Sequence, residues 1–292
     1  MRSNRTSKCL FAMVLSTVFL SAVISAHAQA PSSTPQPSKT PTLESQFFKN
    51  VLRDQKAIWT SPFHLRGRDA RWLAPLSLGT AALIATDRRT GDEIAESTSQ
   101  LNASRIVSYA GSAYGVGGIA ATFYLFGRAR HDERARETGL LGAEALIDSA
   151  IVVTALKEIT QRGRPLSGRD RSEFFDGGSS FPSGHSIEAW SLAAVIANEY
   201  HDHRWVQIGA YGIASAVSLS RFTGSKHYLS DVLVGSAAGY GIGRYVYRTH
   251  HRAKTDSGDE EESHSRSKLF PLIAPEYSRR ARDYGVVLAW NF

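Results

Sequence analysis

The sequence predicts an all-α protein, a helical bundle of about six core helices followed by a short C-terminal β-hairpin. Three observations support this fold class. Several apolar segments are long enough to form helices, charged or glycine-containing turns separate them, and none alternates polar and apolar residues as a strand does. Hydrophobic residues make up 42% of the 292-residue chain, which is enough for a sizeable core. The expected helical segments are 72–86, 101–127, 138–161, 184–200, 204–220 and 228–248.

The first thirty residues have the pattern of a secretory signal peptide. Arg2, Arg5 and Lys8 precede an apolar run, and small residues end it at AHAQA, residues 26–30. A transmembrane anchor is the alternative, but the apolar run is short and ends in an Ala-x-Ala pattern. The sequence therefore predicts a signal peptide over 1–30 and an exported protein of the periplasm or cell envelope.

Charge and cysteine content exclude two classes of protein. Loss of the signal removes three cations and no acids, which lowers the formal charge from +7 to +4. The remaining basic residues do not form the clusters with interleaved aromatic residues that are typical of nucleic-acid binding, so no nucleic-acid partner is expected. The sole cysteine, Cys9, lies inside the signal, so the mature chain is not a disulfide-stabilised scaffold.

Between the signal and the bundle the sequence predicts a tether and one amphipathic helix. Residues 31–42 are rich in proline and serine, which is typical of a disordered tether. Apolar residues from Leu43 to Ile58 recur at helical spacing, and Ser61 and Pro62 end this helix. We interpret it as a cover for the edge of the core; a helix on a membrane surface is the alternative. The all-α domain would span 43–252.

One long apolar segment and the C-terminal tail need separate interpretations. Residues 106–127 are apolar and long enough to span a bilayer, but their Gly, Ala and Ser content favours a buried bundle helix over a transmembrane one. Residues 253–267 form a charged linker. In the tail, 268–292, large residues alternate with small ones, which predicts a β-hairpin.

The segment KEITQRGRP brings two cations together. Lys157 and Arg164 are seven residues apart, two helical turns, so both can point from one helix face. Arginine offers a planar fork to two oxygens of a phosphate, and lysine adds a point charge. Two solvated cations that complement the dipole of a helix end are the alternative.

The segment FPSGHS predicts a helix start that can bind an anion. Free backbone N–H groups at the positive end of a helix can donate hydrogen bonds to an anion. Ser183 and Gly184 would be the donors, with His185 standing over the ligand. A simple capped helix with a surface histidine is the alternative. A Ser183 nucleophile is disfavoured because the pattern Gly-x-Ser-x-Gly is missing.

The segment SRFTGSKHYLSD supplies a nucleophile or base. His227 and Asp231 are spaced i, i+4, so they are expected to face each other across one helical turn. A carboxylate bonded to one ring nitrogen leaves the other nitrogen available as nucleophile or base. Arg221 adds a third cation. A zinc site is the alternative, but three neighbouring cations would repel the metal. The three segments together predict a site for a phosphate-like oxyanion.

These motifs carry a family resemblance. Lys-x6-Arg-Pro, Pro-Ser-Gly-His and Ser-Arg-x5-His-x3-Asp resemble the signature of the type 2 phosphatidic acid phosphatase and vanadium haloperoxidase superfamily, with every defining position matched. The resemblance covers about residues 70 to 250. It implies an enzyme, a phosphoric monoester hydrolase that acts on a phosphomonoester or pyrophosphate, above all a lipid phosphate. It also implies that no metal or other cofactor is needed, with vanadate as a mimic of phosphate.

The resemblance also implies a role for each residue. His227 would attack phosphorus and form a phosphohistidine, Asp231 would orient it, and His185 would protonate the leaving oxygen. The groups expected to hold the phosphate oxygens are Lys157, Arg164, Arg221 and the amides near Ser183 and Gly184.

The expected partners are a phosphorylated lipid or small phosphoester and, through the apolar segments, a membrane. Two alternative functions remain at the level of the sequence. One is vanadate-dependent halide oxidation in the same pocket. The other is a non-catalytic envelope protein that binds phosphate or acts as a scaffold, and the pairing of His227 with Asp231 argues against it because phosphate binding alone needs only cations.

Overall fold

The structure is a computed structural model that describes residues 43–93, 97–166, 172–251, 272–278 and 283–289. The predicted signal peptide (1–30), tether (31–42) and charged linker (253–267) lie outside the described residues.

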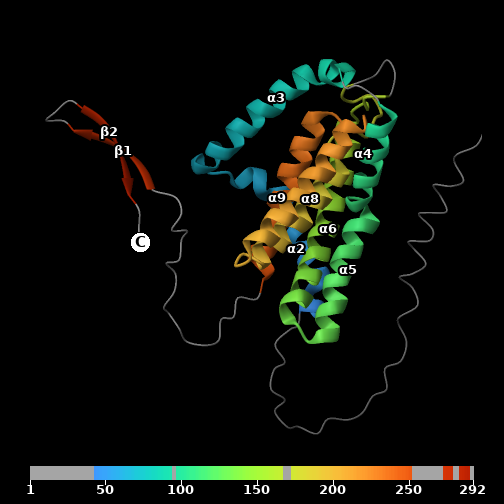
Figure 1. The fold of residues 1–292 in the computed structure, drawn as a ribbon, viewed down its shortest axis with the longest axis vertical. Coiled ribbons are helices and arrows are strands. Elements are labelled where there is room, and N and C mark those ends of the chain that lie inside the picture. The colour runs from blue at the N-terminus through green and yellow to red at the C-terminus, as the bar shows by residue number, and fades with distance from the viewer. Residues whose placement is uncertain (1–42, 94–96, 167–171, 252–271, 279–282, 290–292) are drawn as a thin grey trace, which may run out of the picture. The chain divides into compact units, whose positions relative to one another are not determined.

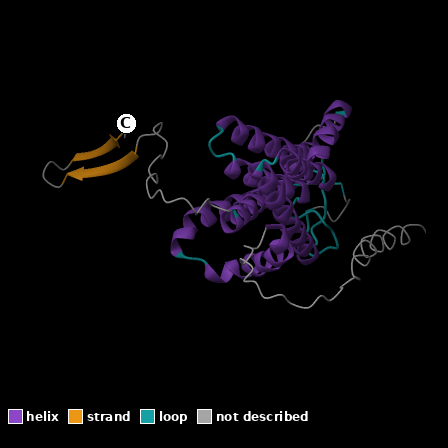
Figure 2. Ribbon diagram, turned by 90° about the horizontal axis from the view of Figure 1, so that it is seen from below, coloured by secondary structure: helices purple, strands orange, loops and turns teal. Residues whose placement is uncertain are grey.

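The all-α prediction is confirmed. Two short 3-10 helices, η1 and η2, connect the first two helices. The helices are α2 (Leu43–Thr60), η1 (Ser61–His64), η2 (Gly67–Asp69), α3 (Ala70–Glu93), α4 (Thr98–Ala110), α5 (Ala113–Arg130), α6 (Glu133–Thr160), α7 (Gly184–Glu199), α8 (Arg204–Thr223) and α9 (Leu229–His250). Figure 1 shows α4, α5, α6, α8 and α9 side by side in a bundle, with α3 running obliquely across one end, and Figure 2 shows the same helices from another side.

Two strands follow the helices, in the region where the sequence predicts a hairpin. Strands β1 (Leu272–Ser278) and β2 (Asp283–Ala289) pair antiparallel. The register joins Leu272 to Ala289 at one end and Ser278 to Asp283 at the other.

The expected single helix over 101–127 is wrong, because the chain turns at Gly111 and Ser112 between α4 and α5. The side chain of Ser112 accepts a hydrogen bond from the backbone N–H of Gly115 and so caps the start of α5. Gly111 packs so tightly on α8 that a β-carbon there would lie 2.1 Å from Cγ1 of Val217. The apolar stretch 106–127 is therefore two helices and not one span.

Helix α7 lies at the centre of the bundle, in contact with α6, α8 and α9. Its apolar residues face three sides, because the helix is surrounded by others on most of its circumference. The largest core cluster joins α6, α7 and α9 and contains Leu141, Ala145, Val152, Val153, Ile187, Val195, Ile242 and Val246.

A stripe of glycines brings α9 into backbone contact with α7. A β-carbon on Gly235, Gly239 or Gly243 would lie 2.7, 2.2 or 2.1 Å from a backbone carbonyl oxygen of α7 or its N-cap. These glycines recur every four residues, so they share one face of α9. Because no other side chain fits there, the stripe sets the distance between the two helices that carry the second and third motifs.

Helix α2 forms as predicted, but its buried face is partly polar. Val51 is buried, as the amphipathic pattern predicts, yet Phe48 and Leu52 are exposed. Asn50 and Asp54 are buried in their place. The hydrophobic pattern could not predict this, because the partners of these two polar residues lie on α6 and α9, far along the chain.

Candidate active site

The three motif segments meet at one end of the bundle, where α6 ends and α7 and α9 begin. The backbone N–H of Ser183 donates a hydrogen bond to the backbone oxygen of Asp231 at 3.0 Å, which joins the second motif to the third. A β-carbon on Gly184 would lie 3.5 Å from Nζ of Lys157, which joins the second motif to the first. The structure therefore brings the predicted site residues together.

Lys157, Arg164 and Arg221 place three positive charges in this region. Burial, and then the charge of Arg164, lowers the pKa of both Lys157 and Arg221 below their ordinary values. Nη1 of Arg221 donates to Oγ of Ser108 at 3.0 Å, and Nη2 of Arg164 donates to Oγ of Ser179 at 3.4 Å. Nε of Arg221 is buried with no hydrogen-bond partner among the described residues. Cations that repel one another in a partly buried site are stabilised by an anion.

His227 presents one ring nitrogen to this region and uses the other for a hydrogen bond. Its ring is buried, with 3% of the residue exposed. Nδ1 lies 2.8 Å from the carbonyl oxygen of Ser180, so the proton is on Nδ1 and Nε2 carries the free electron pair. Burial lowers the pKa of His227, and Asp231 only partly offsets this effect. The neutral ring is therefore the dominant form at neutral pH.

The expected helical pairing of His227 with Asp231 is wrong in its geometry. His227 lies before α9, and Asp231 is in the first turn of that helix. Nδ1 of His227 is 3.5 Å from Oδ2 of Asp231 and makes its shorter contact with Ser180. The two residues meet because the chain folds back after α8, where the N–H groups of Lys226 and His227 donate to the carbonyl oxygen of Arg221.

Asp231 is the centre of a buried hydrogen-bond network. It accepts from Oγ of Ser180 at 2.5 Å and from the backbone N–H of Tyr228 at 2.9 Å. Burial raises the pKa of Asp231, but its contacts with His227, Arg162 and Ser180 outweigh that effect and bring the pKa below the ordinary value. The carboxylate is therefore ionised at neutral pH and fixes Ser180, whose carbonyl group orients His227.

Arg162 is a site residue that the sequence reasoning missed. It is fully buried, and its Nη1 donates to Oδ1 of Asp231 at 2.6 Å while its Nη2 donates to Oδ2 of Asp87 at 2.9 Å. Its guanidinium also stacks on the rings of Phe174 and Tyr228, 4.8 and 4.5 Å from the ring centres. The sequence did contain a signal for it, because Arg162 is a second arginine inside KEITQRGRP. Its partner Asp87, however, lies 75 residues away.

The expected donor role of the Ser183 amide is wrong, because that N–H already donates to Asp231. The side chain of Ser183 caps α7 by accepting from Ser186. The first amide groups of the helix belong to Gly184 and His185, and such groups have no acceptor inside the helix. The amides that can face a ligand at this helix start are therefore those of Gly184 and His185, one residue later than predicted.

His185, in the first turn of α7, is partly buried. Burial, and then Arg221 and the other site cations, lowers its pKa to about 4. Both histidines of the site are thus neutral before a ligand binds. Three cations, two helix amides and two neutral imidazoles can bind a phosphate-like dianion and attack it.

The segment that carries the three motifs has a counterpart among known families. Residues 138–255, which contain all three motifs, match the family model of the PAP2 superfamily.

Two kinds of relatives were found. The lipid A 1-phosphatase of Porphyromonas gingivalis is 30% identical over 103 residues, 35% of this chain and 23% of that protein, so the match spans about a quarter of the relative. The fold is similar to a transmembrane PAP2-type phosphatidylglycerolphosphate phosphatase from Bacillus subtilis, with a TM-score of 0.50 and 21% identity over 63% of this chain and 98% of that one. A structure of LpxE from Aquifex aeolicus has a TM-score of 0.44 and 18% identity over 56% of this chain and 93% of that one.

Proposed function

We propose that this protein is a phosphatase that hydrolyses the phosphomonoester or pyrophosphate of a lipid through a phosphohistidine. The observation that carries the proposal is the buried, neutral His227. Its Nδ1–H donates to the carbonyl oxygen of Ser180, and Arg164 and Arg221 are close enough to lower the pKa of its ring. The relatives support the lipid as substrate, since one is named for lipid A and another for phosphatidylglycerolphosphate.

In the first step, the electron pair on Nε2 of His227 attacks phosphorus and the bond from phosphorus to the ester oxygen breaks. His185 gives a proton to the leaving oxygen. In the second step, His185 takes a proton from water, the water oxygen attacks phosphorus, and the bond from phosphorus to Nε2 breaks. Lys157, Arg164 and Arg221 stabilise the equatorial oxygens, so the charge of the transition state needs no metal ion.

His185 can act as the acid only if the bound substrate raises its pKa, so that the ring takes up a proton. With a pKa of about 4 in the free protein, His185 is neutral at pH 7. A phosphate dianion beside the ring favours the charged imidazolium and raises this pKa. We expect the ring signal of His185 in NMR to titrate near pH 4 in the free protein and at higher pH with inorganic phosphate. A midpoint near 6.5 in both states would contradict this account, and His185→Gln assigns the signal.

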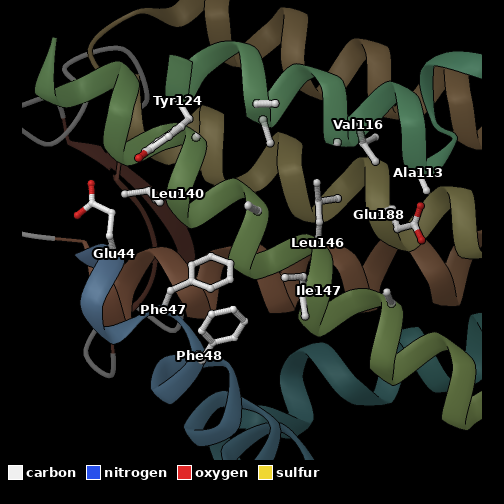
Figure 3. A pocket seen from close by; sticks show the side chains of 16 residues that line it. Glu44, Phe47, Phe48, Ala113, Val116, Tyr124, Leu140, Leu146, Ile147 and Glu188 are labelled. Carbon is white, nitrogen blue, oxygen red and sulfur yellow. The ribbon is translucent and has the colours of Figure 1, made fainter. Parts of the chain in front are cut away.

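An apolar pocket leads away from the site and fits a lipid chain. It has a volume of about 540 Å³ and lies between α2, α5, α6 and α7. Figure 3 shows Glu44 and Glu188 at its opposite ends, with apolar side chains such as Phe47 and Ile147 between them. Glu188 lies in the first turns of α7 and is close enough to Lys157 that the two charges attract. A hydrocarbon chain in the pocket would thus have its phosphate near the cations.

Filling the pocket should separate lipid substrates from water-soluble ones. Ala143 lines the pocket from α6, and we expect Ala143→Trp to lower kcat/KM for phosphatidate by about 10-fold or more, since it removes room for several methylene groups. Hydrolysis of p-nitrophenyl phosphate should change little. The control is Ala82→Trp on the exposed part of α3. Equal losses on both substrates would contradict a chain-binding role for the pocket.

The outer faces of the helices support association with a membrane. Trp205, Ile208 and Ile213 on α8 and Tyr114 and Leu125 on α5 are exposed large apolar residues. Bundles that stay in water rarely expose so much apolar surface. Among the described residues, α6 alone has the length and composition of a membrane-crossing helix, and half of its most apolar window is buried in the bundle. Recovery of the protein in the soluble fraction of lysed cells, before any wash of the membranes, would contradict membrane association.

The experiment that tests the function is phosphate release by the purified protein from p-nitrophenyl phosphate, phosphatidate and undecaprenyl pyrophosphate. Release from the lipids supports the proposal. Release from none of the three would overturn it. The assay is repeated after dialysis against EDTA, and we expect an unchanged rate, because no step uses a metal ion. Export to the periplasm or envelope is a further part of the proposal, tested by fractionation of cells.

A further inference from the structure

A second cluster of buried polar groups lies away from the active site, where α2, α6 and α9 pack together. It consists of Asp54 on α2, Glu144 on α6 and His250 at the end of α9, each at most 9% exposed. Lys157 is thirteen positions after Glu144 on α6, a distance of about 20 Å along the helix. The active-site chemistry therefore does not explain this cluster.

The spacing of its polar atoms matches the edges of a metal coordination polyhedron. Nε2 of His250 is 2.9 Å from both carboxylate oxygens of Asp54 and 3.2 Å from Oε1 of Glu144. One ligand atom from each residue lies within 4.8 Å of the others. Ligands about 2.1 Å from a zinc ion stand about 3.0 to 3.4 Å apart in octahedral or tetrahedral geometry. The three side chains can therefore bind one ion with small shifts.

Unpaired buried oxygens are a second, independent observation at the same place. Nε2 of His250 bonds to Asp54, so Oε1 of Glu144 is left without a hydrogen bond among the described residues. Asp148, one turn along α6 and fully buried, uses Oδ1 to accept from Gln55 at 2.8 Å, while its Oδ2 has no partner. Oδ1 of the buried Asn50 has none either. Leaving such groups unpaired costs about 1 to 3 kcal/mol each.

The residue types of the cluster also suit a cation. It holds three carboxyl groups, those of Asp54, Glu144 and Asp148, and one imidazole, that of His250. Tyr245 of α9 also faces Asp54. Within the described part of the chain, the salt-bridge partner of Asp54 and Glu144 is His250, and no lysine or arginine pairs with them.

We propose that Asp54, Glu144 and His250 bind a divalent transition-metal ion of the class of Zn²⁺ or Mn²⁺. One imidazole and two carboxylates suit these ions. The ion would join α2 to α6 and α9, with Asp148 and Asn50 as groups that orient the ligands or bind a water on the metal. Its role is structural, because it fixes the first helix of the bundle and lies far from the phosphate site.

The test is metal binding by the full chain, with no substrate present. The purified protein is stripped with a chelating resin and titrated with Zn²⁺ and Mn²⁺ in a calorimeter, and Co²⁺ binding is followed by visible absorption. We expect one equivalent of ion and a thermal midpoint about 5 °C higher with the ion than without it. Glu144→Gln and His250→Gln should weaken binding at least about 10-fold.

The control is Glu133→Gln, which removes the same charge from an exposed position on α6 and should leave binding unchanged. Circular dichroism of each variant shows whether it is folded. The Co²⁺ spectrum of the unaltered protein tests metal binding even if a variant does not fold. Absence of binding to the unaltered protein, or equal binding by Glu144→Gln and the control, overturns the proposal. Since phosphate release is measured separately, a failure here is distinct from a failure of the phosphatase proposal.

Discussion

Replacing His227 with alanine removes phosphate release, by at least about 10³-fold in kcat/KM, while the bundle stays folded. The nucleophile is lost, and none of the neighbouring cations can form a covalent bond to phosphorus. The fold survives because the main loss is the hydrogen bond from Nδ1 to Ser180, worth about 1 kcal/mol. The measurement is phosphate release at saturating and at low substrate, with circular dichroism on the same sample.

The matched control is His201→Ala, an exposed histidine in the turn between α7 and α8. It should keep full activity. A denaturing quench at alkaline pH of the unaltered protein during turnover should trap phosphate on histidine, and the His227→Ala variant should trap none. Full activity in that variant would refute the phosphohistidine mechanism and move attention to direct attack by water.

Replacing Arg162 with methionine should be costly for both stability and activity. The change leaves Asp231 and Asp87 buried without the guanidinium that bonds to both. Removal of one partner from a buried ion pair costs about 3 to 5 kcal/mol, because an uncompensated charge remains. The pKa of Asp231 then rises, and the network that holds Ser180 and His227 loosens. Urea unfolding and kcat report the two effects.

The control for this prediction is an exposed pair of the same type. Arg88 donates to Glu173 at 2.8 Å, and each side chain is 57% exposed. Arg88→Met should cost less than about 1 kcal/mol, because water screens the pair. Similar costs for the two methionine variants would show that Arg162 is not the structural centre of the site.

The sequence was enough to predict the all-α fold and the set of residues that gathers at the site. Apolar segments of helical length gave the bundle, because each must bury a face against another. The FPSGHS helix start could be predicted because it is a local feature. The expectation that Lys157 and Arg164 share one helix face is wrong, because α6 ends at Thr160, four residues before Arg164. The sequence could not show which amide is free, because the N–H of Ser183 bonds to Asp231, which is 48 positions further along the chain.

Two other features depend on contacts that a linear pattern does not contain. The partner of Arg162 is Asp87, on α3, which no motif mentions. His227 and Asp231 have the spacing of a helical turn, but a helix cannot begin until the chain has folded back at Ser225, whose φ is 52°. The spacing therefore identified His227 and Asp231 as a pair, although the two residues do not meet across a helical turn.

The glycine stripe on α9 has a consequence for how this sequence can vary. Gly235 and Gly239 lie four and eight positions after Asp231, and their contacts with α7 hold the His227 segment against the His185 segment. A single added methyl group at either position would push the two histidines apart without touching a substrate. Substitutions at these two glycines should therefore lower the rate of the reaction as substitutions of the histidines would, although the glycines do not touch the substrate.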